Sequence, residues 1–156
     1  MFGSFGRRGV GYKVRTLREN IGRILGLNRE WNVAVIGAGQ LSNVLMHSEI
    51  FREKNLLIKK IFDNTPEMIS KRIRGIEVSD MANLEKELNP EEIHLAVIVL
   101  PPVEVQSMID RRSKMGIKGA LYFASRTVNV RGRMVVRKRD ISIDLGGLTY
   151  DIAKNT

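Results

Sequence analysis

The residues best suited to chemistry form a short glycine-rich segment, Gly37-Ala38-Gly39-Gln40-Leu41-Ser42. A compact apolar run at residues 32–36 precedes it and a helical pattern follows it, which places the glycines at a strand-to-helix turn. Such a turn points backbone amides at the pyrophosphate of a dinucleotide. Gly37 permits the tight turn and Gly39 lets the backbone approach phosphate, whereas Ser42 replaces the third glycine of the pattern.

A second candidate is the pair Asp63-Asn64, which follows the apolar run at residues 57–62. An aspartate at the end of the second strand accepts hydrogen bonds from the adenosine ribose and repels a 2′-phosphate. The pattern therefore favours NAD(H) over NADP(H). An aspartate that only forms a turn is the structural alternative. The neighbouring cations Lys71, Arg72 and Arg74 keep another phosphorylated nucleotide, coenzyme A included, open as the ligand.

Other residues with reactive side chains lack the spacing of a catalytic or metal site. His47 and His94 are the only histidines, and neither has the spacing of a metal ligand or a triad member. Glu91 and Glu92 precede a strand in a solvated connection, and no histidine is placed to activate Ser125. Without cysteine there is no disulfide or thiolate site. We therefore expect binding rather than catalysis, with a small NAD-dependent oxidoreductase as an alternative.

Alternating strand and helix patterns must position these residues. Strands are predicted at residues 32–36, 57–62, 76–78, 93–100, 119–123 and 134–136. Helices are predicted from residue 12 to a stop at Gly26 and at residues 40–54, 65–70, 81–88, 103–115 and 143–153. Parallel strands require such helical crossovers. The order predicts an α/β fold of the Rossmann type, a doubly wound, mostly parallel sheet with helices on both faces.

The composition is that of one water-soluble domain. The 156 residues are 43% hydrophobic and 28% charged, and no apolar run approaches the roughly 20 residues of a membrane helix. No signal peptide is evident, so the cytoplasm is the expected compartment. A net charge of +9 suits an anionic partner. The cations are scattered over several clusters rather than gathered on one recognition helix, so base-specific DNA reading by this chain alone is not expected.

Several segments together resemble the bacterial Rex family of redox-sensing repressors. They are Gly9-Val10-Gly11-Tyr12-Lys13-Val14, Ile24-Leu25-Gly26-Leu27-Asn28-Arg29-Glu30-Trp31-Asn32-Val33-Ala34, Phe62-Asp63, Gly116-Ile117-Lys118-Gly119 and Asn129-Val130. The resemblance implies a homodimer that joins an N-terminal winged-helix DNA-binding domain to a Rossmann domain. It also implies that NADH binding releases the protein from operator DNA, as a redox-sensing regulator without catalytic residues or metal.

The resemblance also assigns cofactor-binding residues. Gly37, Ala38, Gly39, Gln40 and Leu41 match the pyrophosphate loop, Asp63 the ribose-binding aspartate, Leu100, Pro101, Phe123, Ala124 and Ser125 the nicotinamide side, and Asp140 an aspartate that reports ligand state. Ser125 replaces a proline of the family. A tyrosine that partners the reporting aspartate in some members corresponds to Ser48, which implies altered communication of the redox state.

The resemblance further implies a division of the chain. Residues 1–11 are expected to be a linker or remnant of a winged-helix domain whose recognition helix the sequence lacks, and residues 12–142 the NAD(H)-binding domain. Residues 143–156 are expected to form a helix that swaps into the partner of a homodimer, carrying Ile143, Leu145, Leu148 and Ile152. The alternative is that this apolar stripe packs on its own sheet. DNA is the partner of full-length members, and a membrane is not.

Overall fold

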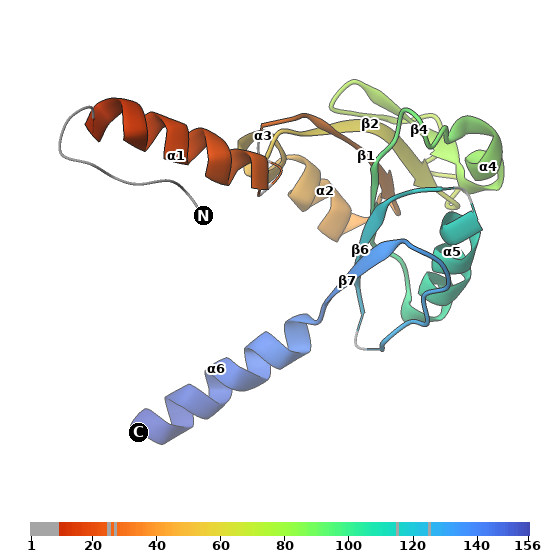
Figure 1. Cartoon of the computed structure of the whole chain (residues 1–156). Coiled ribbons are helices and arrows are strands. Elements are labelled where there is room, and N and C mark those ends of the chain that lie inside the picture. The colour runs from red at the N-terminus through yellow and green to blue at the C-terminus, as the bar shows by residue number, and fades with distance from the viewer. Residues whose placement is uncertain (1–9, 25, 27, 115, 125) are drawn as a thin grey trace.

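A seven-stranded sheet in the order β3-β4-β2-β1-β5-β6-β7 forms the centre of the molecule (Figure 1). The computed structural model describes residues 10–24, 26, 28–114, 116–124 and 126–156. The strands are β1 Trp31–Ile36, β2 Leu56–Asp63, β3 Arg72–Ile73, β4 Ile76–Asp80, β5 Leu95–Ile98, β6 Gly119–Phe123 and β7 Val135–Arg139. Only β3 and β4 pair antiparallel. The parallel strands follow the doubly wound order, which reverses between β1 and β5, so the predicted fold class is confirmed.

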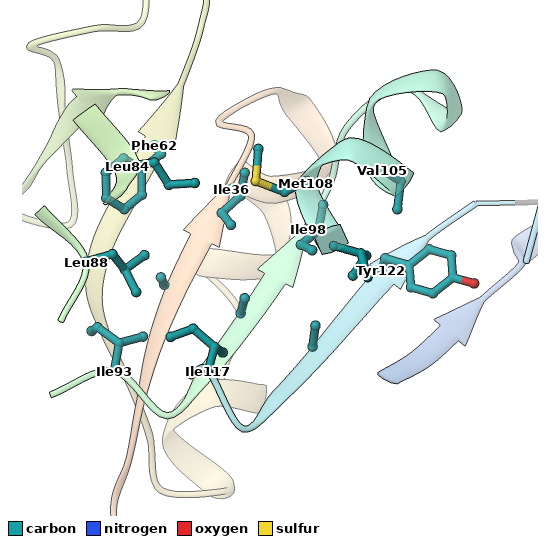
Figure 2. Close-up of a cluster of buried hydrophobic side chains, with 14 of the residues drawn as sticks. Ile36, Phe62, Leu84, Leu88, Ile93, Ile98, Val105, Met108, Ile117 and Tyr122 are labelled. Carbon is teal, nitrogen blue, oxygen red and sulfur yellow. The ribbon is translucent and has the colours of Figure 1, made fainter. Parts of the chain in front are cut away.

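The sheet is covered on both faces, as its apolar strands require. Along β1, Val33 and Val35 belong to one buried cluster, and Ala34 and Ile36 belong to the other. The helices α2 and α3 contribute to the first cluster, and α4 and α5 to the second. Figure 2 shows the second cluster, in which Tyr122 of β6 lies beside side chains from α5. The core therefore fixes the strand ends from both sides.

The helices differ from the sequence predictions mainly at their ends. They are α1 Val10–Ile24, α2 Gln40–Met46, α3 Ile50–Glu53, α4 Leu84–Glu87 after the 3₁₀ turn Met81–Asn83, α5 Pro102–Lys114 and α6 Ile141–Asn155. The single helix predicted at 40–54 is wrong, because the chain breaks at residues 47–49. There the Ser48 hydroxyl donates to the carbonyl oxygen of Leu45, which competes with the helical hydrogen bonds. None of the described helices is both long and apolar enough to cross a bilayer.

Two other predictions change in the structure. Residues 66–70 form hydrogen-bonded turns instead of the helix predicted at 65–70. The backbone N–H of Ser70 donates to the carbonyl of Val78, so this segment is held by the antiparallel hairpin of β3 and β4, which the sequence did not indicate. The strand predicted at 93–100 contracts to β5, although Ile93 before it remains buried.

The first and last helices extend away from the sheet (Figure 1). α1 begins two residues earlier than predicted, and residues 1–9 of the expected linker lie outside the described part. Every residue of α6 is exposed, including Leu145 and Leu148. The alternative in which the α6 stripe packs on its own sheet is therefore wrong.

The connection from α1 to the sheet rests on Trp31 and His94. The indole Nε1–H of Trp31 donates to the carbonyl of Gly26 at 2.8 Å, and its ring meets His94 edge-on at a centroid distance of 5.7 Å. His94 Nδ1 accepts the backbone N–H of Asn32 at 2.9 Å, which requires an unprotonated nitrogen. Burial, followed by the charges of Arg29 and Lys118, lowers the pKa of His94 below its ordinary value of 6.5.

A fall in pH should weaken this connection. Because the pKa of His94 is lower in the folded chain, its stabilising contribution is complete above the unfolded pKa of about 6.5 and is lost as pH falls through the folded value. We expect His94→Asn, which keeps an acceptor but does not titrate, to flatten the pH dependence of the urea midpoint around this range. His47→Asn, on an exposed histidine, should retain the parent profile. A steeper profile in His94→Asn would contradict the assignment.

Candidate functional site

The glycine turn after β1 is tightly held at its first residue. Gly37 has a φ of +96°, which favours glycine, and its N–H donates to the carbonyl of Phe62 at 2.8 Å. A Cβ placed on Gly37 would lie 2.0 Å from the backbone oxygen of Val99. The turn is therefore wedged between the ends of β2 and β5, and only glycine fits there.

The third residue of the turn is open. A Cβ placed on Gly39 would meet no atom within 4 Å. Gly39 is the N-cap of α2, and no side chain caps the helix there, so the N–H groups of the first turn are left for an external acceptor. Space beside unpaired amides is what an anionic oxygen needs. This combination fits the pyrophosphate position that the sequence predicted.

Asp63 ties the glycine turn to the end of β2. Its Oδ2 accepts the N–H of Ala38 at 2.5 Å and its Oδ1 accepts the N–H of Thr65 at 2.7 Å. The residue is only 6% exposed. Burial raises the pKa of Asp63, but the hydrogen bonds from Ala38, Thr65 and Asn64 outweigh it and leave the pKa below its ordinary value of 3.8. The carboxylate therefore stays charged and holds the glycine turn. The sequence predicted Asp63 as a ribose ligand, with a local turn as the alternative, and did not predict its contact with Ala38.

The remaining predicted residues gather at the same edge of the sheet. Leu100 and Pro101 follow β5, Phe123 ends β6 and Ala124 follows it, Asp140 follows β7, and Asn64 follows β2. Because all these strands run parallel to β1, their carboxyl ends meet at one edge, where the strand order reverses beside the glycine turn. Ser125 lies outside the described residues. The structure thus brings the described candidates together along one edge.

Asp140 links this edge to α6. Its side chain accepts the N–H of Ser142 at 3.0 Å and so caps the helix. One residue before it, the carbonyl of Arg139 accepts the N–H of Ala124 at 3.1 Å. The Phe123–Ala124 segment is therefore linked to the first turn of α6 through Arg139 and Asp140.

Ser42 fills the position of the third glycine. It is buried, and its hydroxyl has no hydrogen-bond partner among the described residues. The small side chain lets α2 pack on the sheet, as glycine would. The departure from the motif therefore leaves the turn intact, at the expense of one unsatisfied hydroxyl.

Two of the three cations proposed for a coenzyme A phosphate make their hydrogen bonds away from the glycine turn. Arg74 lies in the turn before β4, at the amino edge of the sheet, and donates to the carbonyl of Met46. It lines a cavity there together with Phe51 and Leu57. Arg72 donates to the nearby carbonyl of Gly75 at 3.0 Å. The described residues contain no cluster of metal-ligating side chains.

The two glycines of the turn should respond oppositely to the same substitution. Gly37→Ala forces a Cβ against the Val99 carbonyl at positive φ, so it should destabilise the chain by about 3 kcal/mol or more. Gly39→Ala places a Cβ in open space and should change stability by no more than about 1 kcal/mol. Urea unfolding measures both. Equal destabilisation of the two variants would contradict this geometry.

Comparison with known proteins places the chain in a family. A family model described as a CoA binding domain matches residues 28–126. The redox-sensing transcriptional repressor Rex of Carboxydothermus hydrogenoformans is 38% identical over 154 residues, which are 99% of this chain and 74% of that protein. The repressor Rex 1 of Thermotoga maritima is also 38% identical over 154 residues, covering 98% of this chain and 73% of that protein.

Solved structures agree with these relatives. RSP in complex with β-NAD⁺ and operator DNA matches with a TM-score of 0.86 and 29% identity, over 99% of this chain and 71% of that one. RSP in complex with β-NADH matches with a TM-score of 0.82 and 27% identity, over 91% and 69%. A further RSP structure is described as a Rex-family repressor. Similarity of this extent shows that the chain belongs to the Rex family of redox-sensing transcriptional repressors.

Proposed function

We propose that this chain is the NAD(H)-binding sensor of a Rex-type transcriptional regulator in the cytoplasm. The observation that carries the proposal is the open position at Gly39, bordered by uncapped amides and held in place by Asp63. This is the backbone arrangement that receives a pyrophosphate. The β-NADH and β-NAD⁺ complexes of the similar protein RSP support the choice of ligand.

Different residues along the sheet edge would bind different parts of the dinucleotide. The amides of the segment Gly37-Ala38-Gly39-Gln40-Leu41 would hold the pyrophosphate, and Asp63 with Asn64 would lie beside the adenosine ribose. Two oxygens of Asp63 already accept backbone N–H groups, yet a carboxylate offers further lone pairs to a ribose hydroxyl. Its charge disfavours a 2′-phosphate. The nicotinamide half would lie over Leu100, Pro101 and the Phe123–Ser125 segment.

Redox sensing requires only that the site bind NADH and NAD⁺ with different affinities. Reduction removes the positive charge of the nicotinamide ring, so a site can favour one form. The segment at Phe123 is one hydrogen bond from Arg139, and the next residue, Asp140, caps α6. Ligand state would bias the position of α6 by this route, with Asp140 as the coupling residue. No covalent step is needed, which favours a binding protein over an oxidoreductase.

The helix α6 supports a homodimer. Two adjacent glycines, Gly146 and Gly147, interrupt its 15 residues, and each costs a helix about 1 kcal/mol relative to alanine. An isolated helix of this length is marginal even with good residues. Its apolar side chains lie on more than one side and are all exposed, namely Ile141, Ile143, Leu145, Leu148, Tyr150 and Ile152. Burial against a second copy of the chain would stabilise it.

Within this proposal the chain divides as the family resemblance implies. Residues 12–142 form the nucleotide-binding domain, residues 143–156 the exchanged helix, and residues 1–11 the connection toward a DNA-reading domain. RSP has been solved with operator DNA, and DNA is accordingly the regulated partner we propose for the full-length regulator. A change in α6 that alters the dimer would change how two DNA-reading domains are spaced.

Titration calorimetry with NADH, NAD⁺, NADPH and coenzyme A tests the ligand directly. We expect the parent chain to bind NADH and NAD⁺ with different affinities and to bind NADPH more weakly. Gly39→Ala should reduce NADH affinity at least about tenfold, since it displaces charge-assisted hydrogen bonds of about 1.5–3 kcal/mol each. Lys71→Gln, on an exposed residue outside the segments assigned to NADH, should leave NADH affinity unchanged.

Two results would overturn the ligand assignment. Coenzyme A binding more tightly than NADH, with loss of affinity in Lys71→Gln, would favour the coenzyme A alternative. NADH binding that survives Gly39→Ala in full would remove the pyrophosphate from the glycine turn.

Sedimentation velocity at micromolar concentration tests the dimer. Leu148→Asp places a charge among Ile141, Leu145 and Ile152, which lie on the same side of α6, so it should convert dimer to monomer. Asp151→Lys changes the polar side of the same helix and should leave the dimer in place. A parent chain that sediments only as monomer would count against exchange of α6.

A further inference from the structure

The lysines and arginines are scattered along the chain, but the positive charge that acidic residues do not balance lies in one segment. Ten of the 26 lysines and arginines lie between residues 111 and 139, and that segment contains no aspartate or glutamate. The other 16 cations are matched by 17 acidic residues elsewhere. The net charge of +9 therefore belongs to the last turn of α5, to Lys118 before β6, to β7 and to the loop between β6 and β7.

Most of these cations lie at one border of the sheet. β7 is the last strand of the sheet, so one of its edges has no neighbouring strand (Figure 1). We call the cations of β7 and of the loop before it the basic edge. Its members are Arg126, Arg131, Arg133, Arg137 and Arg139, all exposed, and the half-buried Lys138. Among the described residues no ion pair involves any of them.

Protection of an open strand does not account for the basic edge. Charges on an edge strand discourage pairing with other chains, and β7 carries such charges. The loop of residues 124–134 is not a strand, yet it contributes half of the cations. Protection of an edge strand would also work with charges of either sign, whereas all charges of the basic edge are positive. A uniform run that continues beyond the strand indicates an anionic partner.

We propose that the basic edge binds the phosphate backbone of duplex DNA without reading its sequence. Five of its six cations are arginines, whose planar guanidinium matches phosphate oxygens. Residues 126–139 contain no Trp, Tyr, Phe or Leu, which a single-stranded nucleic acid would stack on or a membrane surface would take up. The sensor domain would thereby contribute nonspecific DNA affinity of its own, a role beyond the ligand sensing proposed above.

The test is fluorescence anisotropy of the 156-residue chain with a labelled duplex of arbitrary sequence, between about 50 and 200 mM NaCl. We expect binding that weakens steeply with salt. The double variant Arg133→Gln/Arg137→Gln lacks two phosphate contacts, so its DNA affinity should depend less on salt. Between the lowest and the highest salt its affinity should fall by a factor about tenfold smaller than the factor for the parent. Lys54→Gln/Lys86→Gln removes the same net charge from exposed positions elsewhere and should retain the parent slope.

NADH affinity, measured on the same proteins, should be equal in all three, because neither variant touches the glycine turn. A chain that binds DNA through the basic edge but does not bind NADH would leave this proposal standing and contradict the sensor. Equal loss of salt dependence in both double variants would overturn the proposal, since bulk charge would then explain the binding. No binding at the lowest salt, or tighter binding to phosphatidylserine vesicles than to DNA, would overturn it as well.

Discussion

The site depends on how the glycine turn is held between two strand ends. The Asp63 carboxylate accepts the N–H of Ala38, and Gly37 fits against the Val99 carbonyl so closely that no side chain is tolerated. These contacts join the carboxyl ends of β2, β1 and β5, where the strand order reverses. Without them the amides around Gly39 would have no fixed direction. With them, an anion meets a preformed set of donors and little ordering is required on binding.

The same edge of the sheet continues toward α6. The N–H of Ala124 donates to the carbonyl of Arg139, and Asp140 caps α6. The ends of β6 and β7 are therefore linked directly to this exposed helix. In the proposed sensor, the held glycine turn would supply selective binding, and α6, whose residues are all exposed, would be the element that responds. Three residues of the basic edge, Arg137, Lys138 and Arg139, lie on β7, which leads directly into α6.

The sequence predicted the features that local patterns determine. The apolar runs predicted the parallel strands, and the glycines together with Asp63 predicted the position of the turn. It could not show that Asp63 bonds to Ala38 or that Gly37 meets Val99, because these contacts join residues far apart in the chain. It also missed the hairpin of β3 and β4, where two residues of β3 carry no strand pattern. The break at Ser48 depends on a side-chain hydrogen bond that helical periodicity does not show.

The most direct test of the account is to follow the backbone amide resonances of the chain by NMR while NADH is added. If the held glycine turn is the nucleotide site, the amides of Gly39, Gln40 and Leu41 should shift most and saturate together. The account would be contradicted if these resonances stayed fixed while those around the amino-edge cavity, at Phe51 and Arg74, shifted instead.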